Sequence, residues 1–229
     1  MKKVIALILC YLFVTNALFA LAENYHPSPS VETKFGNFNP YLALINKEHE
    51  LPDGWLDHIK LVETQNSFGD TFLVEEITLA HFNALREDLL KDGIQIELDS
   101  TYRPREEQEE IWNEWKEKYG EEYCEKYLAR PGFSEHHTGL AIDIGIVKDG
   151  IFINDNDEMI AEREIFAKIH AKLTQYGFIL RYPEGKKAIT GYDYEPWHFR
   201  FVGEDIARDI FEQKLTLEEY LEQHPELQP

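Results

Sequence analysis

The segment that most constrains the fold is a strand with a strict two-residue alternation, residues 140–147. One row of this strand is apolar and the other is mixed: Leu140, Ile142, Ile144 and Ile146 against Ala141, Asp143, Gly145 and Val147. Because successive side chains of a β-strand face opposite sides of the sheet, one face must pack against a core while the other presents a carboxylate. Shorter strands are predicted at residues 94–98, 178–182 and 198–202.

Helical segments lie between these strands without alternating regularly with them. Apolar spacing and end signals predict one helix capped by Thr78 and ending at Gly93, and others over 104–119, 121–130 and the stretch before Gly177. The capping box Thr216-x-x-Glu219 begins a tail helix. Irregular alternation indicates an α+β fold, a single domain whose mainly antiparallel sheet is flanked by helices.

The N-terminus has the composition of an export signal. Lys2 and Lys3 precede an apolar run, and Ala20-Leu21-Ala22 follows. We expect a signal peptide over residues 1–22 and an exported, extracytoplasmic protein. An uncleaved membrane anchor is the alternative, because the apolar stretch approaches spanning length. The expected organisation then continues with a flexible arm over 23–40, a domain over 41–203 and a helical tail over 204–229.

The charge balance excludes one class of function. The 229 residues include 43 Asp and Glu against 23 Lys and Arg, a formal charge of −20. No basic stripe offsets this charge, so a nucleic-acid partner is not expected. Loss of residues 1–22 would leave Cys124 as the only cysteine, which precludes an intrachain disulfide. Its helical spacing with Tyr127 and Leu128 favours a buried apolar thiol.

Two segments carry residues suited to chemistry. The loop Ser134-Glu135-His136-His137-Thr138-Gly139 leads into the strand with Asp143, and Glu195-Pro196-Trp197-His198 leads into the strand 198–202. Adjacent histidines point apart, so only one of the first pair is expected to face Asp143. Pro196 predicts an irregular segment, which would let Glu195 and His198 converge. A polar hairpin with an exposed aspartate is the alternative for the first segment.

One histidine of the loop 134–139, Asp143 and His198 would together form a three-ligand set with an open fourth position. This is the pattern of a catalytic zinc site, since a structural site is closed by four ligands and is usually rich in cysteine. An unligated carboxylate such as Glu195 could then act as the base. The spacing of these residues is not by itself a general signature.

The motif Ser134-x-His136-x-x-Gly139-x-Ala141-x-Asp143, followed by Glu195-x-x-His198, closely resembles the VanY-type D-alanyl-D-alanine carboxypeptidases, which are zinc peptidases of peptidoglycan. The resemblance runs from about Tyr41 to Gly203. It also takes in Ser100-x-Tyr102-Arg103 with Gln108, the segment 177–182 with Pro183, and the segment 197–203.

The resemblance implies a role for each matching residue. It makes His136, Asp143 and His198 the ligands of one zinc ion at an edge of the sheet, Glu195 the general base and Arg103 the cation that stabilises the oxyanion. It also suggests substrate contacts for four further residues: Ser134, Gln108, Tyr182 and Trp197.

Most of these roles have a structural alternative. Tyr182 and Trp197 could be core residues, Gln108 an exposed polar residue and Arg103 a partner in a structural salt bridge. His137 departs from the family pattern and could support the site or lie on the surface.

The expected function is removal of the terminal D-alanine from peptidoglycan stem peptides or precursors by a monomer with no stable protein partner. Three alternatives remain: an L,D-carboxypeptidase that acts on tetrapeptide stems, a D,D-dipeptidase, and a peptidoglycan-binding module without catalysis. Glu195 argues against the last, because a pure binder does not need a base beside the metal.

Overall fold

The computed structural model describes residues 39–227 and contains a five-stranded antiparallel sheet in that range. Its strands follow the order β3-β4-β7-β6, and β5 pairs with β4. Their bounds are β3 (Gln95–Ser100), β4 (Ala141–Lys148), β5 (Ile151–Ile153), β6 (Phe178–Leu180) and β7 (His198–Phe201). The predicted α+β fold is therefore confirmed. The predicted signal peptide and nearly all of the predicted arm lie outside the described residues and stay predictions.

A two-stranded hairpin that the sequence reading did not predict lies beside the main sheet. It consists of β1 (Leu61–Gln65) and β2 (Thr71–Glu75). The carbonyl of Leu73 accepts hydrogen bonds from Tyr102 N at 3.0 Å and Thr101 Oγ1 at 2.8 Å. The hairpin thus holds residues 101–102, which follow β3. The carbonyl of Thr101 in turn contacts His136.

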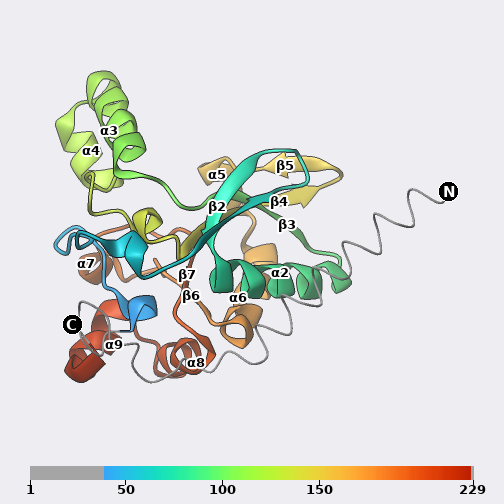
Figure 1. Ribbon diagram of the computed structural model, residues 1–229. Helices are drawn as coiled ribbons and strands as arrows, with labels where there is room; N and C mark the ends of the chain where they lie inside the picture. Colours follow the sequence, from blue (N-terminus) through green and yellow to red (C-terminus); the bar gives the residue numbers. More distant parts are fainter. Residues whose placement is uncertain (1–38, 228–229) are drawn as a thin grey trace.

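The long helices pack around the sheet, except for α3 and α4, which form a hairpin that projects from the body (Figure 1). The helices are α2 (Glu76–Lys91), α3 (Arg105–Tyr119), α4 (Glu121–Tyr127), α5 (Asn156–Ala161), α6 (Arg163–Leu173), α7 (Lys187–Thr190), α8 (Glu204–Gln213) and α9 (Leu217–Gln223). The predicted capping box is present at the start of α9, where Thr216 Oγ1 accepts from Glu219 N at 3.2 Å.

Two predicted helix boundaries were wrong. The N-cap of α2 is Glu75 rather than Thr78, because the Glu75 carboxylate accepts from Thr78 N at 2.7 Å. Helix α4 ends at Tyr127 rather than Arg130, and Lys47 Nζ binds two carbonyls of its last turn, those of Glu125 and Lys126. Glu75 and Lys47 bind the free backbone groups at these two helix ends, and the spacing of apolar residues along each helix identifies neither of them.

The buried apolar residues form two clusters. The larger cluster joins the apolar row of β4 to α2 and α6, and includes Ile142, Ile144, Phe82 and Phe166. The smaller cluster joins β6 to α8 and α9 through residues such as Ile179, Ile210 and Leu221. Cys124 is buried and free, as predicted. Within residues 39–227, no helix has the length and apolar character needed to cross a bilayer.

The predicted site lies on the two inner strands rather than on an outermost strand. Asp143 of β4 pairs in register with His198 of β7. The 3-10 turn η3 (Glu135–Thr138) precedes β4 and ends at Gly139, whose φ of 73° is left-handed. Gly139 therefore connects the turn that carries His136 to the strand that carries Asp143.

Substitution of Gly139 by alanine should destabilise the protein through two effects. The added Cβ would lie 2.7 Å from Leu61 Cδ2, and the backbone would keep a left-handed conformation. Gly150→Ala is the matched control, since Gly150 has a φ of +79° and nothing within 4 Å of the added Cβ. We expect a loss of roughly 1–2 kcal/mol in unfolding free energy for Gly150→Ala and about 1–3 kcal/mol more for Gly139→Ala. Urea denaturation measures both, and equal losses would show that the contact with Leu61 is relieved without strain.

Candidate metal centre and active-site cavity

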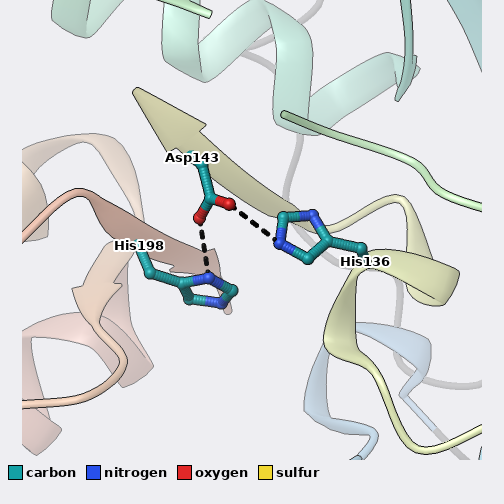
Figure 2. A group of neighbouring side chains, drawn as sticks. All are labelled: His136, Asp143 and His198. Carbon is teal, nitrogen blue, oxygen red and sulfur yellow. Dashed lines mark ion pairs between the residues drawn. The ribbon is translucent and has the colours of Figure 1, made fainter. Parts of the chain in front are cut away.

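Three side chains bring their donor atoms together between β4, β7 and η3 (Figure 2). His136 Nε2 lies 3.1 Å from Asp143 Oδ2, and His198 Nδ1 lies 2.8 Å from Asp143 Oδ1. One donor atom from each residue lies within 4.8 Å of the others. Asp143 and His198 meet because residues directly opposite in an antiparallel pair project on the same face. The convergence predicted from the two motifs is therefore present.

Hydrogen bonds on the outer side of each imidazole set the orientation of both rings. His136 Nδ1 lies 2.7 Å from the carbonyl of Thr101, so this nitrogen carries the proton and Nε2 is left with a lone pair. His198 Nε2 lies 3.4 Å from Glu135 Oε2, which leaves Nδ1 to face Asp143. Each ring thus directs its inner nitrogen, His136 Nε2 or His198 Nδ1, toward Asp143.

The donor set fits a divalent cation such as zinc. Asp143 Oδ1 is buried and, among the described residues, has no hydrogen bond of good geometry despite its closeness to His198. A buried polar atom without a partner is rare in folded proteins, and a metal ion would satisfy it. Two imidazoles and one carboxylate match the three-ligand sets of catalytic zinc sites.

The protonation of the metal-free centre follows from its burial and its close charges. Burial opposes ionisation of Asp143, but His136 and His198 outweigh it and hold the pKa of Asp143 far below its usual range. Burial alone would lower the pKa of His198, and the adjacent Asp143 carboxylate instead raises it to about 10. Burial lowers the pKa of His136. The carboxylate is therefore ionised before any metal arrives.

Glu195 lies next to this centre because the segment before β7 is irregular, as predicted. Its Oε2 lies 4.0 Å from His198 Nδ1, and the backbone N of His198 donates to the carbonyl of Glu195 at 3.3 Å. His170 of α6 fixes the turn through a 2.9 Å contact with the carbonyl of Pro196. Burial raises the pKa of Glu195 to about 7. A carboxyl group with such a pKa can both accept and donate a proton near neutral pH.

Arg103 is held in place by neutral groups. Its guanidinium donates to Gln108 Oε1 and to Ser100 Oγ, each at 2.8 Å. Among the residues from 39 to 227, no carboxylate lies within ion-pair distance of Arg103, so the structural salt bridge is not present. Its positive charge therefore stays available to a ligand in the cavity.

Gln108 and His137 both support Arg103. Gln108 is buried rather than exposed, and its Nε2 donates to the carbonyl of Ala129 at 2.8 Å. His137 is also buried and points away from Asp143, as adjacent histidines should. Its Nδ1 contacts the carbonyl of Arg103 at 2.6 Å, and its Nε2 accepts from Gly132 N at 3.0 Å. The surface alternative for His137 is wrong, and the residue supports the site.

All of the predicted site residues line one cavity of about 930 Å³. Ser134 caps η3 through a 3.3 Å contact with His136 N. The ring of Tyr182 packs against that of His198, with centroids 4.7 Å apart, while Trp197 belongs to the larger core cluster as well as to the cavity wall. Substrate contacts for these residues and for Gln108 stay predictions. Helices α3 and α4 add three aromatic residues to the lining: Trp115, Tyr123 and Tyr127.

Glu135 is the residue that sequence reasoning missed. It is buried between the motif residues Ser134 and His136, and its Oε1 accepts from Arg181 Nε at 2.7 Å and from Arg200 Nη1 at 2.9 Å. Burial opposes its charge, but the two guanidinium groups outweigh burial and hold the pKa of Glu135 far below its usual range. The residues around Glu135 gave no signal for this role, because Arg181 and Arg200 are far from it in the sequence.

Comparison with known proteins agrees with this geometry. A family model described as VanY, D-alanyl-D-alanine carboxypeptidase, matches residues 71–204. A relative from Enterococcus gallinarum, the bifunctional D-Ala-D-Ala dipeptidase and D-Ala-D-Ala carboxypeptidase VanXYC, is 38% identical over 186 residues, which cover 78% of this chain and 92% of that protein.

Two solved structures share the fold. A mutant of the vancomycin resistance D,D-pentapeptidase VanY, solved with Zn(II), has a TM-score of 0.66 and 32% identity, covering 80% of this chain and 99% of that one. The LD-carboxypeptidase LdcB has a TM-score of 0.70 and 33% identity, covering 80% and 87%. The resemblance in the motifs is thus confirmed along most of the described residues, and the chain belongs to the VanY D-alanyl-D-alanine carboxypeptidase family.

Proposed function

We propose that this chain is a zinc-dependent carboxypeptidase that removes the C-terminal D-alanine from peptidoglycan stem peptides or their precursors. The observation that carries the proposal is the convergence of three metal donors, a carboxyl group with a raised pKa and an uncompensated guanidinium in one cavity. The names of the relatives support the substrate class, since VanXYC acts on D-Ala-D-Ala as dipeptidase and carboxypeptidase.

His136, Asp143 and His198 would hold the zinc ion. When bound, zinc supplies Lewis acidity toward water and toward the substrate carbonyl. Glu195 removes a proton from the attacking water and passes it to the leaving amine nitrogen, so the same carboxyl group acts first as base and then as acid. Its Oε2 lies beside the metal donors, 4.0 Å from His198 Nδ1.

Arg103 stabilises the negative charge that develops on the carbonyl oxygen during attack. A preorganised cation in a site shielded from water is effective because it needs no reorientation as charge forms. Gln108 and Ser100 supply this preorganisation, since they bind two different nitrogens of the guanidinium and fix its plane.

A second candidate function is an L,D-carboxypeptidase that releases D-alanine from tetrapeptide stems. The match to LdcB, an LD-carboxypeptidase, favours it as directly as the match to VanY favours D,D cleavage. The metal donors and Glu195 serve either reaction, because both reactions hydrolyse the amide bond to a terminal D-alanine and differ in the residue that precedes it.

Zinc should stabilise the purified protein, and a chelator should reverse the effect. Binding to the folded state alone contributes about 2.7 kcal/mol when the free metal is at 100 times its Kd. The melting temperature should therefore rise with zinc for the wild type and for the control His224→Ala, which lies in the tail. It should not rise for His136→Ala. An equal zinc-dependent rise in the His136→Ala protein would remove this residue from the metal site.

Glu195→Gln should keep zinc and lose turnover. The amide has almost the same shape but cannot take up a proton, so kcat should fall by about 10²- to 10⁴-fold. Glu184→Gln is the control, because Glu184 is an exposed carboxylate that pairs with Arg163 outside the cavity. Release of D-alanine measures kcat, and the zinc content of each protein is measured in parallel. Wild-type turnover by Glu195→Gln would refute the proposed base.

The masses of the products identify the bond that the protein hydrolyses. The purified protein is incubated with muropeptides that end in D-Ala-D-Ala, with muropeptides that end in one D-alanine, and with free D-Ala-D-Ala, each with and without a chelator. We expect chelator-sensitive loss of one alanine from the first substrate. Loss from the second alone would establish the L,D activity, and cleavage of the free dipeptide would indicate a dipeptidase. Zinc binding without any cleavage would favour a peptidoglycan-binding module.

A further inference from the structure

A chain of buried ion pairs connects the C-terminal helix α9 to His198. Glu218, the second residue of α9, accepts from Arg181 Nη1 at 2.8 Å and from Arg181 Nη2 at 2.6 Å. The third nitrogen of the same guanidinium, Nε, binds Glu135 Oε1 at 2.7 Å. Glu135 Oε2 faces His198 Nε2 at 3.4 Å. One arginine thus joins a carboxylate of the tail to the carboxylate that orients His198.

The charges of these buried ion pairs balance only when Glu218 is included. Arg181 and Arg200 carry two positive charges and are fully buried, while Glu135 and Glu218 carry the two negative ones. Removal of one partner from a buried ion pair leaves an uncompensated charge, which is strongly unfavourable. Without Glu218, both arginines would depend on Glu135 alone and would draw its carboxylate away from the imidazole.

The position of Glu218 is fixed by its surroundings. Asn46 Nδ2 donates to Glu218 Oε1 at 3.2 Å. The capping box at Thr216 sets the start of α9, and Leu217 and Leu221 bury the helix in the smaller core cluster. Glu218 lies outside the segment matched by the family model, which ends at residue 204.

We propose that α9 is part of the metal centre: Glu218, acting through Arg181 and Glu135, is a positioning residue that holds His198 in the orientation needed for zinc binding. Mutation of a residue that hydrogen-bonds to a metal ligand, as Glu135 does to His198, typically changes metal affinity by about 10- to 100-fold. Glu218 acts through Arg181 and Glu135, so the lower end of this range applies to it. The proposal rests on the metal role given to His198 above, but not on the identity of the substrate.

The test compares the zinc affinity of metal-free Glu218→Gln with that of the wild type, by competition with a chromogenic chelator at a temperature where circular dichroism shows both to be folded. We expect affinity to fall by about 10-fold. Glu222→Gln is the matched control, an exposed carboxylate on the same helix, and should bind as the wild type does. Glu218→Asp keeps the charge on a shorter side chain and should recover part of the loss.

The outcomes separate positioning from simple stabilisation of the fold. If Glu218→Gln melts earlier but binds zinc with wild-type affinity, α9 only stabilises the protein and the proposal is overturned. If Glu218→Gln does not fold, Arg181→Lys decides. One ammonium group cannot replace the three guanidinium nitrogens that join Glu218 to Glu135, so wild-type zinc affinity in that variant would overturn the proposal. Absence of zinc binding by the wild type would refute the metal assignment itself, whereas absence of hydrolysis alone would bear only on the proposed substrate.

Discussion

The contact between Asp143 and His198 depends on the register of two strands. Because side chains alternate along a strand, a shift of one residue between β4 and β7 would turn one of these donors to the opposite face of the sheet. The apolar row of β4 prevents such a shift, since Ile142, Ile144 and Ile146 would then leave the core. The same residues that drive folding therefore fix the position of the metal donors, and Asp143 is the one ionised residue in the middle of an otherwise apolar strand.

The buried ion pairs near His198 fix the positions of side chains more than they stabilise the fold. Buried ion pairs are weak evidence for stability, because desolvation offsets much of the attraction. Here the pairs occupy every nitrogen of Arg181, and the carbonyls of Tyr41 and Ala43 take further hydrogen bonds from Arg200. A group with all its partners in place has one favourable orientation. Glu135, which depends on both arginines, is thereby restricted to one position beside the imidazole.

The parts of the site that sequence reasoning identified are those encoded by short-range patterns. Alternation located the strand of Asp143, and Pro196 indicated the irregular segment that lets Glu195 approach His198. The hairpin β1–β2, the burial of Gln108 and the role of Glu135 were not found. Each of these depends on partners distant in sequence: Leu73 with Thr101, Gln108 with Ala129, and Glu135 with Arg181 and Arg200. The resemblance to a family could place the motif residues, but it assigned no role to a residue between them.

The cavity is lined by two parts of the fold. The metal donors and Glu195 come from the sheet and the turns that lead into it, where register and buried hydrogen bonds leave little freedom. The α3–α4 hairpin, which projects from the body (Figure 1), adds Trp115, Tyr123 and Tyr127 to the lining. Arg103 and Gln108 lie where this hairpin joins the sheet. Since D,D and L,D cleavage require the same chemistry at the metal, the difference between them must come from groups that contact the residues before the scissile bond. The sheet and its entry turns therefore hold what the two reactions would share, and the α3–α4 hairpin is one of the cavity walls beyond that part.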